Sequence, residues 1–364
     1  MQRITPTTAY PLHGTSATRT LERQAAIALP PHTLMRRAGL ATANLAQALV
    51  PHARSVWVAC GPGNNGGDGL DAALHLHDRG YHPVVTWLGQ PGQVPADAQD
   101  AWHRATHAGV TFSDTPPAHV DLCIDALLGI GSARAPHGQM AQWVQHINHS
   151  NATVLAIDVP TGLHSETGAF SGPATDAKDP ASNCVRAHHT LSLLTLKPGL
   201  FTAHGRDYAG QVWLDHLGVD VSGVAANAQL TGLPLRLAHR HASHKGTRGD
   251  VAILGGAPGM TGAALLAASA ALHAGAGRVF VCLLDANAIG VDLVQPELML
   301  RPYAQLPLEA LTVVCGCGGD TAVAGVLGEV MARAPRLVLT RMHSTPSLRT
   351  HALKPNCVTG VARK

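Results

Sequence analysis

The sequence predicts an α/β protein with a doubly wound, mostly parallel sheet, followed by a second, smaller α/β unit. Short apolar runs alternate with segments of helical periodicity along most of the 364 residues. This alternation is typical of parallel sheets that carry helices on both faces. Glycine-rich stretches join strand to helix at 61–69 and again at 255–262. Apolar residues make up 46% of the chain and aromatic residues only 4%, which suits closely packed layers.

The elements of the first half follow in a regular order. Helices are expected first at 16–29, which opens with Ser and Thr as cap candidates, and at 31–50, which has a proline near its first turn and apolar residues at helical spacing. Strands are then expected within 55–60, 82–89, 110–114, 120–129 and 152–164, with helices after residue 69 and at 99–109 and 138–150. Ligands of such sheets bind where the strands end, so the polar loops that follow strands are candidate sites.

The second half of the sequence indicates where the domain boundaries lie. Residues 187–200 and 205–218 are expected to supply the last strands of the first sheet. A new strand, glycine turn, helix and strand begin near residue 249. We therefore expect a first domain at 1–222, a linker at 223–240, the start of a second domain at 241–339, and a tail at 340–364 that does not belong to it.

Composition excludes several classes of protein. The net charge is +3 and no block of Lys and Arg is present, which argues against a nucleic-acid partner. No stretch approaches the length of a membrane span and the first residues lack an apolar signal region, so we expect a cytoplasmic protein without a membrane partner. Seven cysteines without a framework indicate reduced thiols, and the spacing of Cys315 and Cys317 fits no common zinc site.

The first glycine-rich stretch, GPGNNGGDG, is a candidate phosphate site. It is neither a P-loop, since no GK[ST] follows, nor the dinucleotide fingerprint. Its position between strand and helix points backbone N–H groups into the crevice, where the helix dipole favours an anion. Asn64, Asn65 and Asp68 add polar side chains. The alternative is a tight turn in which glycine relieves the backbone and Asn caps the helix.

Two carboxylates end neighbouring apolar strands. Asp125 precedes a loop with Ser132 and Arg134, and Asp158 precedes Thr161. Each Asp would be explained by an Asx-turn alone, but together they form a polar group opposite the Asn-rich loop. The oxygens of Asn65, Asp125 and Thr161 suit a monovalent cation or magnesium, which leaves Asp158 as an acid or base. The planar group of Arg134 suits a phosphate.

Four segments closely resemble the NAD(P)H-hydrate epimerases, the YjeF N-terminal domain family. In order, they are CGPGNNGGDG, DALLGIGSARAP, IDVPTGLHSETG and LKPGLFTAHGRDYAGQVWLDHLG. The resemblance covers residues 1 to about 220. It implies a Rossmann-like sheet and an enzyme that interconverts the two epimers of hydrated NADH and NADPH.

The resemblance also implies site residues. One substrate loop falls on Asn64, Asn65, Gly66, Gly67 and Asp68, a second on Gly129, Ile130, Gly131, Ser132, Ala133, Arg134 and Ala135, and a further substrate contact on Asp158. A potassium site falls on Asn65, Asp125 and Thr161, where the family usually has Ser at the last position. Our mechanistic hypothesis is that Asp158 moves a proton while the hydroxyl-bearing carbon loses and regains its oxygen.

Residues 244–277 resemble the opening of the ribokinase-like NAD(P)H-hydrate dehydratases, which use ADP or ATP. Gly262 and Ala263 would then lie near the substrate. The His-Pro loop and the Gly-Thr-Gly-Asp motif of that family are missing here, and after Leu339 the family's Asp-Ala-Asp-Ala-Leu-Asn-Ala is replaced by Thr-Arg-Met-His-Ser-Thr-Pro. Loss of one base from a coding sequence for the first peptide yields the second. We therefore expect a frameshift, a truncated second domain and no dehydratase activity.

Two other functions fit the sequence less well than an epimerase does. A non-catalytic nucleotide-binding or scaffold protein would not need the set Asn65, Asp125, Asp158 and Thr161. A small-molecule kinase would need the missing Gly-Thr-Gly-Asp loop. The expected partner is the small hydrated nucleotide, with a homo-oligomer left open, and the sequence does not separate NADH from NADPH as the parent of the substrate.

Overall fold

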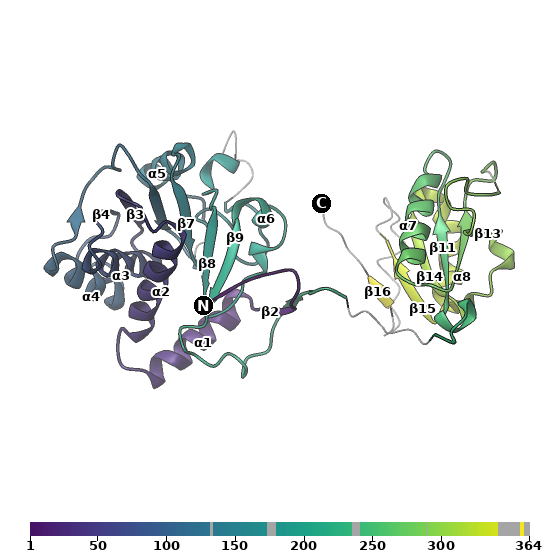
Figure 1. Cartoon of the computed structure of the whole chain (residues 1–364), viewed down its shortest axis with the longest axis horizontal. Coiled ribbons are helices and arrows are strands. Elements are labelled where there is room, and N and C mark those ends of the chain that lie inside the picture. The colour runs from purple at the N-terminus through teal and green to yellow at the C-terminus, as the bar shows by residue number, and fades with distance from the viewer. Residues whose placement is uncertain (132–133, 173–179, 235–240, 289, 341–356, 360–364) are drawn as a thin grey trace. The chain divides into compact units, whose positions relative to one another are not determined.

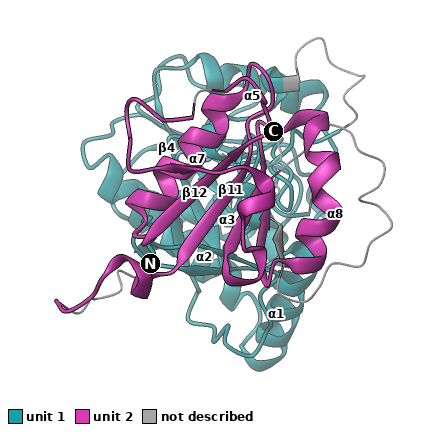
Figure 2. Cartoon of the chain, turned by 90° about the vertical axis from the view of Figure 1, so that its right-hand side faces the viewer, with its two compact units in different colours: residues 1–235 teal, residues 236–364 magenta. Residues whose placement is uncertain are grey.

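The computed structural model describes residues 1–131, 134–172, 180–234, 241–288, 290–340 and 357–359. The chain forms two compact units, Met1–Leu235 and Arg236–Lys364, which Figure 2 draws in two colours. Each unit contains its own large sheet. Within the described part of the chain, no helix has the length and apolar character needed to cross a bilayer.

Unit 1 is built on a sheet of eight strands in the order β1-β9-β8-β7-β6-β3-β4-β5. β1 runs antiparallel to β9, and every other neighbouring pair is parallel. The strands are β1 (Gln2–Arg3), β3 (Val56–Cys60), β4 (Pro83–Trp87), β5 (Thr111–Phe112), β6 (Leu122–Ala126), β7 (Thr153–Ile157), β8 (His189–Leu193) and β9 (Gln211–Asp215). The predicted α/β class with a mostly parallel sheet is therefore confirmed.

Helices cover both faces of this sheet (Figure 1). They are α1 (Thr15–Ala28), α2 (Thr33–Leu49), α3 (Asn64–Asp78), α4 (Ala96–His107), α5 (Gly138–His149) and the short α6 (Gly205–Tyr208). Alternate residues of β3 belong to different cores, because side chains along a strand point to opposite faces. Val58 packs in a core with α2, α3 and α4, whereas Trp57 and Ala59 pack against α5 on the other face.

The strand order reverses direction beside β3. The chain proceeds from β3 outward to β4 and β5, then returns to place β6 on the other side of β3 and continues to β7 and β8. The carboxyl ends of β3 and β6 therefore border a topological switch point, where doubly wound sheets form their ligand crevice. The loops that follow these two strands contain the polar residues selected from the sequence.

The segment 223–240 contains a strand of unit 1. Residues 228–230 form β10 (Ala228–Leu230), which pairs antiparallel with β2 (Tyr10–Leu12). Asn227 adds a side-chain contact, since its Oδ1 accepts a hydrogen bond of 2.8 Å from the N–H of Gly14. This part of the expected linker is thus attached to the N-terminal residues of the chain.

Unit 2 is a second doubly wound sheet, with the order β13-β12-β11-β14-β15-β16 and all pairs parallel. Helix α7 (Thr261–His273) packs on one face with Ile253, and α8 (Ala324–Arg333) packs on the other with Leu254. The strands are β11 (Asp250–Gly255), β12 (Arg278–Leu283), β13 (Met299–Leu300), β14 (Thr312–Cys317), β15 (Arg336–Leu339) and β16 (Cys357–Thr359).

The expected frameshifted tail, 340–364, falls largely outside the described residues. Its segments 341–356 and 360–364 are not described. Residues 357–359 form β16, which pairs with β15. An ordered pairing was not expected for this segment.

Candidate functional site

The glycine-rich stretch lies at the junction of β3 and α3. Helix α3 begins at Asn64, inside the stretch, so Asn64 and Asn65 belong to its first turn. The chain passes very close to its neighbours here: a Cβ atom on Gly61 would lie 1.9 Å from the carbonyl oxygen of Leu127, and one on Gly66 would lie 1.9 Å from that of Gly61. Close packing therefore accounts for these two glycines, and it brings the N-terminus of α3 to the end of β6.

Asp125 and Thr161 meet across the ends of β6 and β7. The hydroxyl of Thr161 donates to Oδ1 of Asp125 at 2.7 Å, and the N–H of Thr161 donates to Oδ2 at 2.8 Å. The same hydroxyl oxygen accepts from the N–H of Leu128 at 3.0 Å. Both side chains are fully buried. The two residues selected from the sequence as oxygen ligands are thus neighbours in the structure.

The electrostatics of Asp125 reflect its burial. Burial raises the pKa of Asp125 to about 6, although the hydrogen bonds from Thr161 and from the N–H of Leu127 act to lower it. The bond from Leu127, at 3.2 Å, joins residues two apart and forms the Asx-turn that was the simpler explanation of this Asp. Asp125 therefore both shapes its own loop and leaves negative charge in a low-dielectric region, where a bound cation would stabilise it.

Asp158 follows β7 and is held from two sides. Oδ2 accepts a hydrogen bond of 3.1 Å from the N–H of Ile130, in the loop after β6. Oδ1 accepts from the ammonium group of Lys197 and, at 3.4 Å, from the N–H of Leu193. The sequence did not predict a partner for this carboxylate: Asp158 forms an ion pair with Lys197, whose side chain is only 1% exposed.

Asn65 and Asp158 converge beside Gly129. A Cβ atom on Gly129 would lie 3.1 Å from Oδ1 of Asn65 and 3.2 Å from Oδ2 of Asp158. The first turn of α3, the loop after β6 and the loop after β7 therefore meet at one point. Within the part of the chain that the structure describes, the buried Nδ2 atom of Asn65 has no hydrogen-bond partner. Such an amide is unusual in a folded protein, and an acceptor group of a ligand would satisfy it.

These donors suit a cation bound by oxygen. Asn65, Asp125 and Thr161 provide an amide oxygen, a carboxylate and a hydroxyl, and hard oxygen ligands bind potassium and magnesium. Among the described residues, no group of three or more His, Cys, Asp or Glu side chains is placed to hold a metal ion. Of these three side chains only that of Asp125 is a carboxylate, and the other two offer neutral oxygens.

Two more carboxyl groups border the same region. Burial, followed by the negative charge of Asp158, raises the pKa of Asp68 well above its usual value. Burial and then Asp158 also raise the pKa of Glu22, while Lys197 and Arg19 act to lower it. Asp68 was selected from the sequence, whereas Glu22, on α1, was not. The site therefore combines carboxyl groups that retain protons to higher pH with one that is paired to an ammonium group.

The loop after β6 is described in part. Ser132 and Ala133 lie outside the described residues. Gly131 lies near Arg19 of α1, since a Cβ atom on Gly131 would be 3.3 Å from Nη2 of that arginine. Arg134 is exposed. Arg19 thus adds a second guanidinium group to the loop that contains Arg134.

Gly262 and Ala263, the residues selected in unit 2, lie in the first turn of α7. Both are exposed. They belong to a different unit from the other candidate residues.

Three residues of the site were missed by sequence reasoning. Arg19 and Glu22 lie on α1, which precedes the matched motifs, and nothing in the pattern of that helix separates them from ordinary surface charges. Lys197 lies inside the segment LKPGLFTAHG, which carried part of the family resemblance. A lysine within an otherwise apolar strand end was the available signal, because lysine is almost never buried without a partner.

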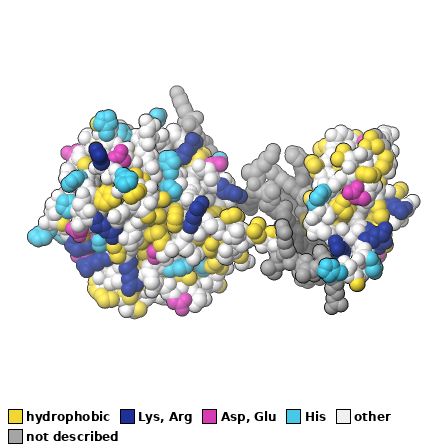
Figure 3. Space-filling model, in the orientation of Figure 1, with side chains coloured by type: hydrophobic (Ala, Val, Ile, Leu, Met, Phe, Trp, Pro, Cys, Tyr) yellow, Lys and Arg dark blue, Asp and Glu magenta, His cyan; other side chains and the backbone are white. Residues whose placement is uncertain are grey.

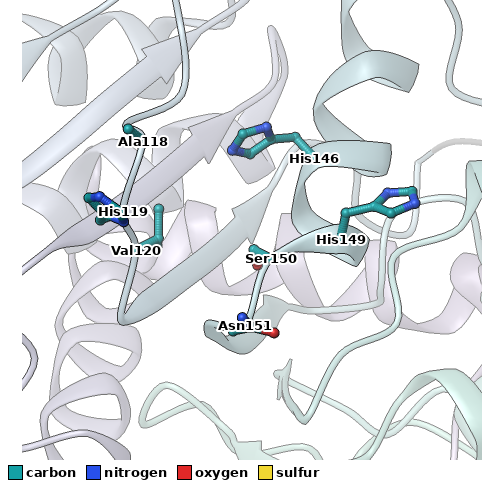
Figure 4. A pocket seen from close by; sticks show the side chains of 7 residues that line it. All are labelled: Ala118, His119, Val120, His146, His149, Ser150 and Asn151. Atoms are coloured by element: carbon teal, nitrogen blue, oxygen red, sulfur yellow. The ribbon is translucent and has the colours of Figure 1, made fainter.

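One surface pocket of about 290 Å³ lies at the opposite edge of the sheet (Figure 4). Its lining comes from the segments that precede β6 and β7 and from the end of α5, and includes His119, His146 and His149. It shares no residue with the candidate site. Histidine side chains are scattered over the visible face of unit 1 (Figure 3).

Comparisons with known proteins find a family match that lies within unit 1. The family described as "YjeF-related protein N-terminus" matches residues 31–199. The bifunctional NAD(P)H-hydrate repair enzyme Nnr of Escherichia coli (strain K12) is 37% identical over 305 residues, 80% of this chain and 56% of that protein. The NAD(P)H-hydrate epimerase of Bordetella pertussis (strain CS) is 39% identical over 187 residues, 51% of this chain and 79% of that protein.

The chain spans only about half the length of the bifunctional relative. It covers most of the epimerase relative. Among solved structures, yeast ynu0 (YNL200c) is similar with a TM-score of 0.45 and 21% identity, over 56% of this chain and 86% of that chain.

Proposed function

The chain belongs to the NAD(P)H-hydrate epimerase family, and we propose that unit 1 interconverts the two epimers of hydrated NADH and NADPH. The observation that carries the proposal is the convergence of Asn65 and Asp158 on Gly129 at the switch point of the sheet. It brings together the loops that the family resemblance assigns to the substrate.

The substrate is a dinucleotide whose two halves are joined by a diphosphate, and the site has groups that suit this anion. The N-terminus of α3, with Asn64 and Asn65 in its first turn, favours an anion through its free N–H groups and its dipole. Arg19 and Arg134 provide guanidinium groups at the loop after β6. We assign binding to this loop, residues 129–135, and to Asn64, Asn65, Gly66, Gly67 and Asp68.

We assign a potassium ion to Asn65, Asp125 and Thr161. The support is the fully buried, oxygen-bearing pair Asp125 and Thr161 and the raised pKa of Asp125. A bound cation supplies positive charge that stabilises Asp125 and the phosphates near it. Thr161 provides the same hydroxyl oxygen as the serine usual in the family.

We infer that Asp68 and Asp158 divide the proton transfers between them. The raised pKa of Asp68 keeps a proton on this carboxyl group, so it can donate to the departing hydroxyl group of the substrate. The C–O bond breaks, the oxygen leaves as water, and the electron pair of the ring nitrogen stabilises the carbon.

Water then adds to either face of that carbon. Asp158, which is paired with an ammonium group, accepts the proton that the water loses. Transfer of this proton from Asp158 to Asp68 restores the initial protonation states of both carboxyl groups. When water adds to the face opposite the one from which the first oxygen departed, the product is the other epimer.

Chromatographic measurement of epimer interconversion tests the proposal. The purified chain is incubated with the separated R or S epimer of hydrated NADH, with potassium chloride or with tetramethylammonium chloride at equal ionic strength. We expect fast interconversion that depends on potassium. A rate equal to that without protein would refute the proposal and would favour a nucleotide-binding protein without activity, which binding of the substrate in the same sample would reveal.

A further inference from the structure

We propose that Lys197 is a positioning residue of this site, which holds Asp158 by one oxygen and leaves the other for the proton transfer. This inference rests on the proposed epimerase function. It concerns a residue that does not itself reach the substrate.

The side chain of Lys197 is almost completely buried, and its ammonium group contacts three acceptors. Its Nζ atom donates to Oδ1 of Asp158, to the carbonyl oxygen of Leu193 at 2.6 Å and to the hydroxyl of Ser192 at 3.3 Å. These three acceptors match the three donors of an ammonium group. Among the described residues, no other lysine or arginine is buried. A buried ion is costly unless it is paired and fully hydrogen-bonded, and these contacts meet that condition.

The backbone of Asp158 adopts a strained conformation, so the orientation of its side chain depends on contacts such as that with Lys197. Its φ angle is 69°, in the left-handed region that residues other than glycine seldom adopt. Its N–H donates to the carbonyl oxygen of Leu191 at 2.7 Å, which ties the turn to β8. Strained backbone of this kind persists where the surroundings fix it, and it gathers at functional sites.

The two oxygens of Asp158 have different surroundings. Oδ1 accepts hydrogen bonds from Lys197 and from the N–H of Leu193, so protein donors surround this oxygen. Oδ2 accepts from the N–H of Ile130 and lies beside Gly129 in the substrate loop. Oδ2 is therefore the oxygen that exchanges a proton with the substrate. Through Asp158, Lys197 also links the loop after β8 to the loop after β6.

A set of variants tests this role. Lys197→Met keeps the length of the side chain and removes its charge, and we expect kcat to fall roughly 100-fold because the carboxylate loses its orientation. KM for the hydrated nucleotide should change little, since Lys197 does not contact it. Lys197→Arg keeps a cation and should restore part of kcat. A Lys197→Met variant with wild-type kcat, or an arginine variant no better than methionine, would overturn the inference.

The double variant Lys197→Met with Asp158→Asn separates positioning from a general loss of structure. If Lys197 acts through Asp158, the double variant has the same kcat as Asp158→Asn alone, because the two changes remove one unit. Independent roles would give the product of the two losses, which contradicts the proposal. The double variant also leaves no unpaired buried charge, so it serves where Lys197→Met alone does not fold.

Failure of the inference is distinct from failure of the proposed function. If the unmodified chain does not interconvert the epimers, the function itself is wrong. If the unmodified chain is active and the variants behave independently of Asp158, only the role of Lys197 is wrong.

Discussion

The hydroxyl of Thr161 donates a 2.7 Å hydrogen bond to Oδ1 of Asp125 and so links the ends of two neighbouring strands. Because this hydroxyl also accepts from the N–H of Leu128, Thr161→Val removes the acceptor of that N–H and one of the two donors to Oδ1 of Asp125, the other being the N–H of Leu127. We expect unfolding free energy to fall by about 1–3 kcal/mol and stabilisation by potassium to disappear. Thr161→Ser is the matched control and should keep both properties. Thermal unfolding in potassium and in tetramethylammonium chloride measures them, and equal potassium stabilisation in all three proteins would contradict the assigned cation site.

Asp158→Asn removes the group to which we assign proton transfer. The expected loss of kcat is roughly 10²–10⁴-fold, as for other acid and base groups. Potassium stabilisation should persist, because the cation is assigned to other residues, and the substrate should still bind through the loops that hold its phosphates. Epimerisation kinetics and calorimetric binding of the hydrated nucleotide check this prediction. A variant that binds normally and epimerises at the wild-type rate would exclude the role.

Gly129→Ala tests the point where three loops meet. The added methyl group would lie 3.1 Å from Oδ1 of Asn65 and 3.2 Å from Oδ2 of Asp158, so it displaces both side chains slightly. We expect activity to fall about tenfold or more with little loss of stability, since a small displacement at a reacting group is costly.

The matched control for that variant is Gly131→Ala in the same loop. Its added methyl group has one neighbour within 4 Å, Nη2 of the flexible Arg19 side chain at 3.3 Å. It should therefore affect kcat much less. Equal losses in the two variants would show that the loop tolerates no added volume anywhere and that Gly129 has no special position.

Asp68 gives the protein a pH-dependent stability with a definite sign. Its pKa is well above 3.8 in the folded protein, so the folded chain retains this proton to higher pH than the unfolded chain does. The resulting stabilisation is complete below about pH 4 and is lost as pH rises toward the folded pKa, with a slope of at most about 1.4 kcal/mol per pH unit. Asp68→Asn lacks this dependence.

Urea unfolding of both proteins at several values from about pH 4 to about pH 8 measures the effect. The difference in unfolding free energy, wild type minus Asp68→Asn, should decrease as pH rises. A difference that is constant or increases over this range would mean that Asp68 is not held in its protonated form by burial.

The repeated alternation of apolar strands and helices was sufficient to predict the architecture. Each strand from β3 to β9 lies within a segment where a strand was expected, because the buried strands of a parallel sheet are short apolar runs with turn residues after them. The last segment, 205–218, was only partly right, since its first four residues form helix α6. The pairing of β10 with β2 was not predictable from such a pattern, since both are short and lie over 200 residues apart. Long-range pairing depends on which surfaces meet after the main sheet has formed.

The sequence by itself selected the candidate residues: Asp125 and Asp158 follow apolar strands, Thr161 lies in the loop after Asp158, and Asn65 and Asp68 belong to the glycine-rich stretch. Only the tertiary structure decided which charged groups surround them. Asp158 faces Lys197 because the loop after β8 packs beside the loop after β7, and α1 places Arg19 and Glu22 at the same crevice. A charge acts over a few ångströms in space and independently of distance along the chain, so its partners are fixed by packing.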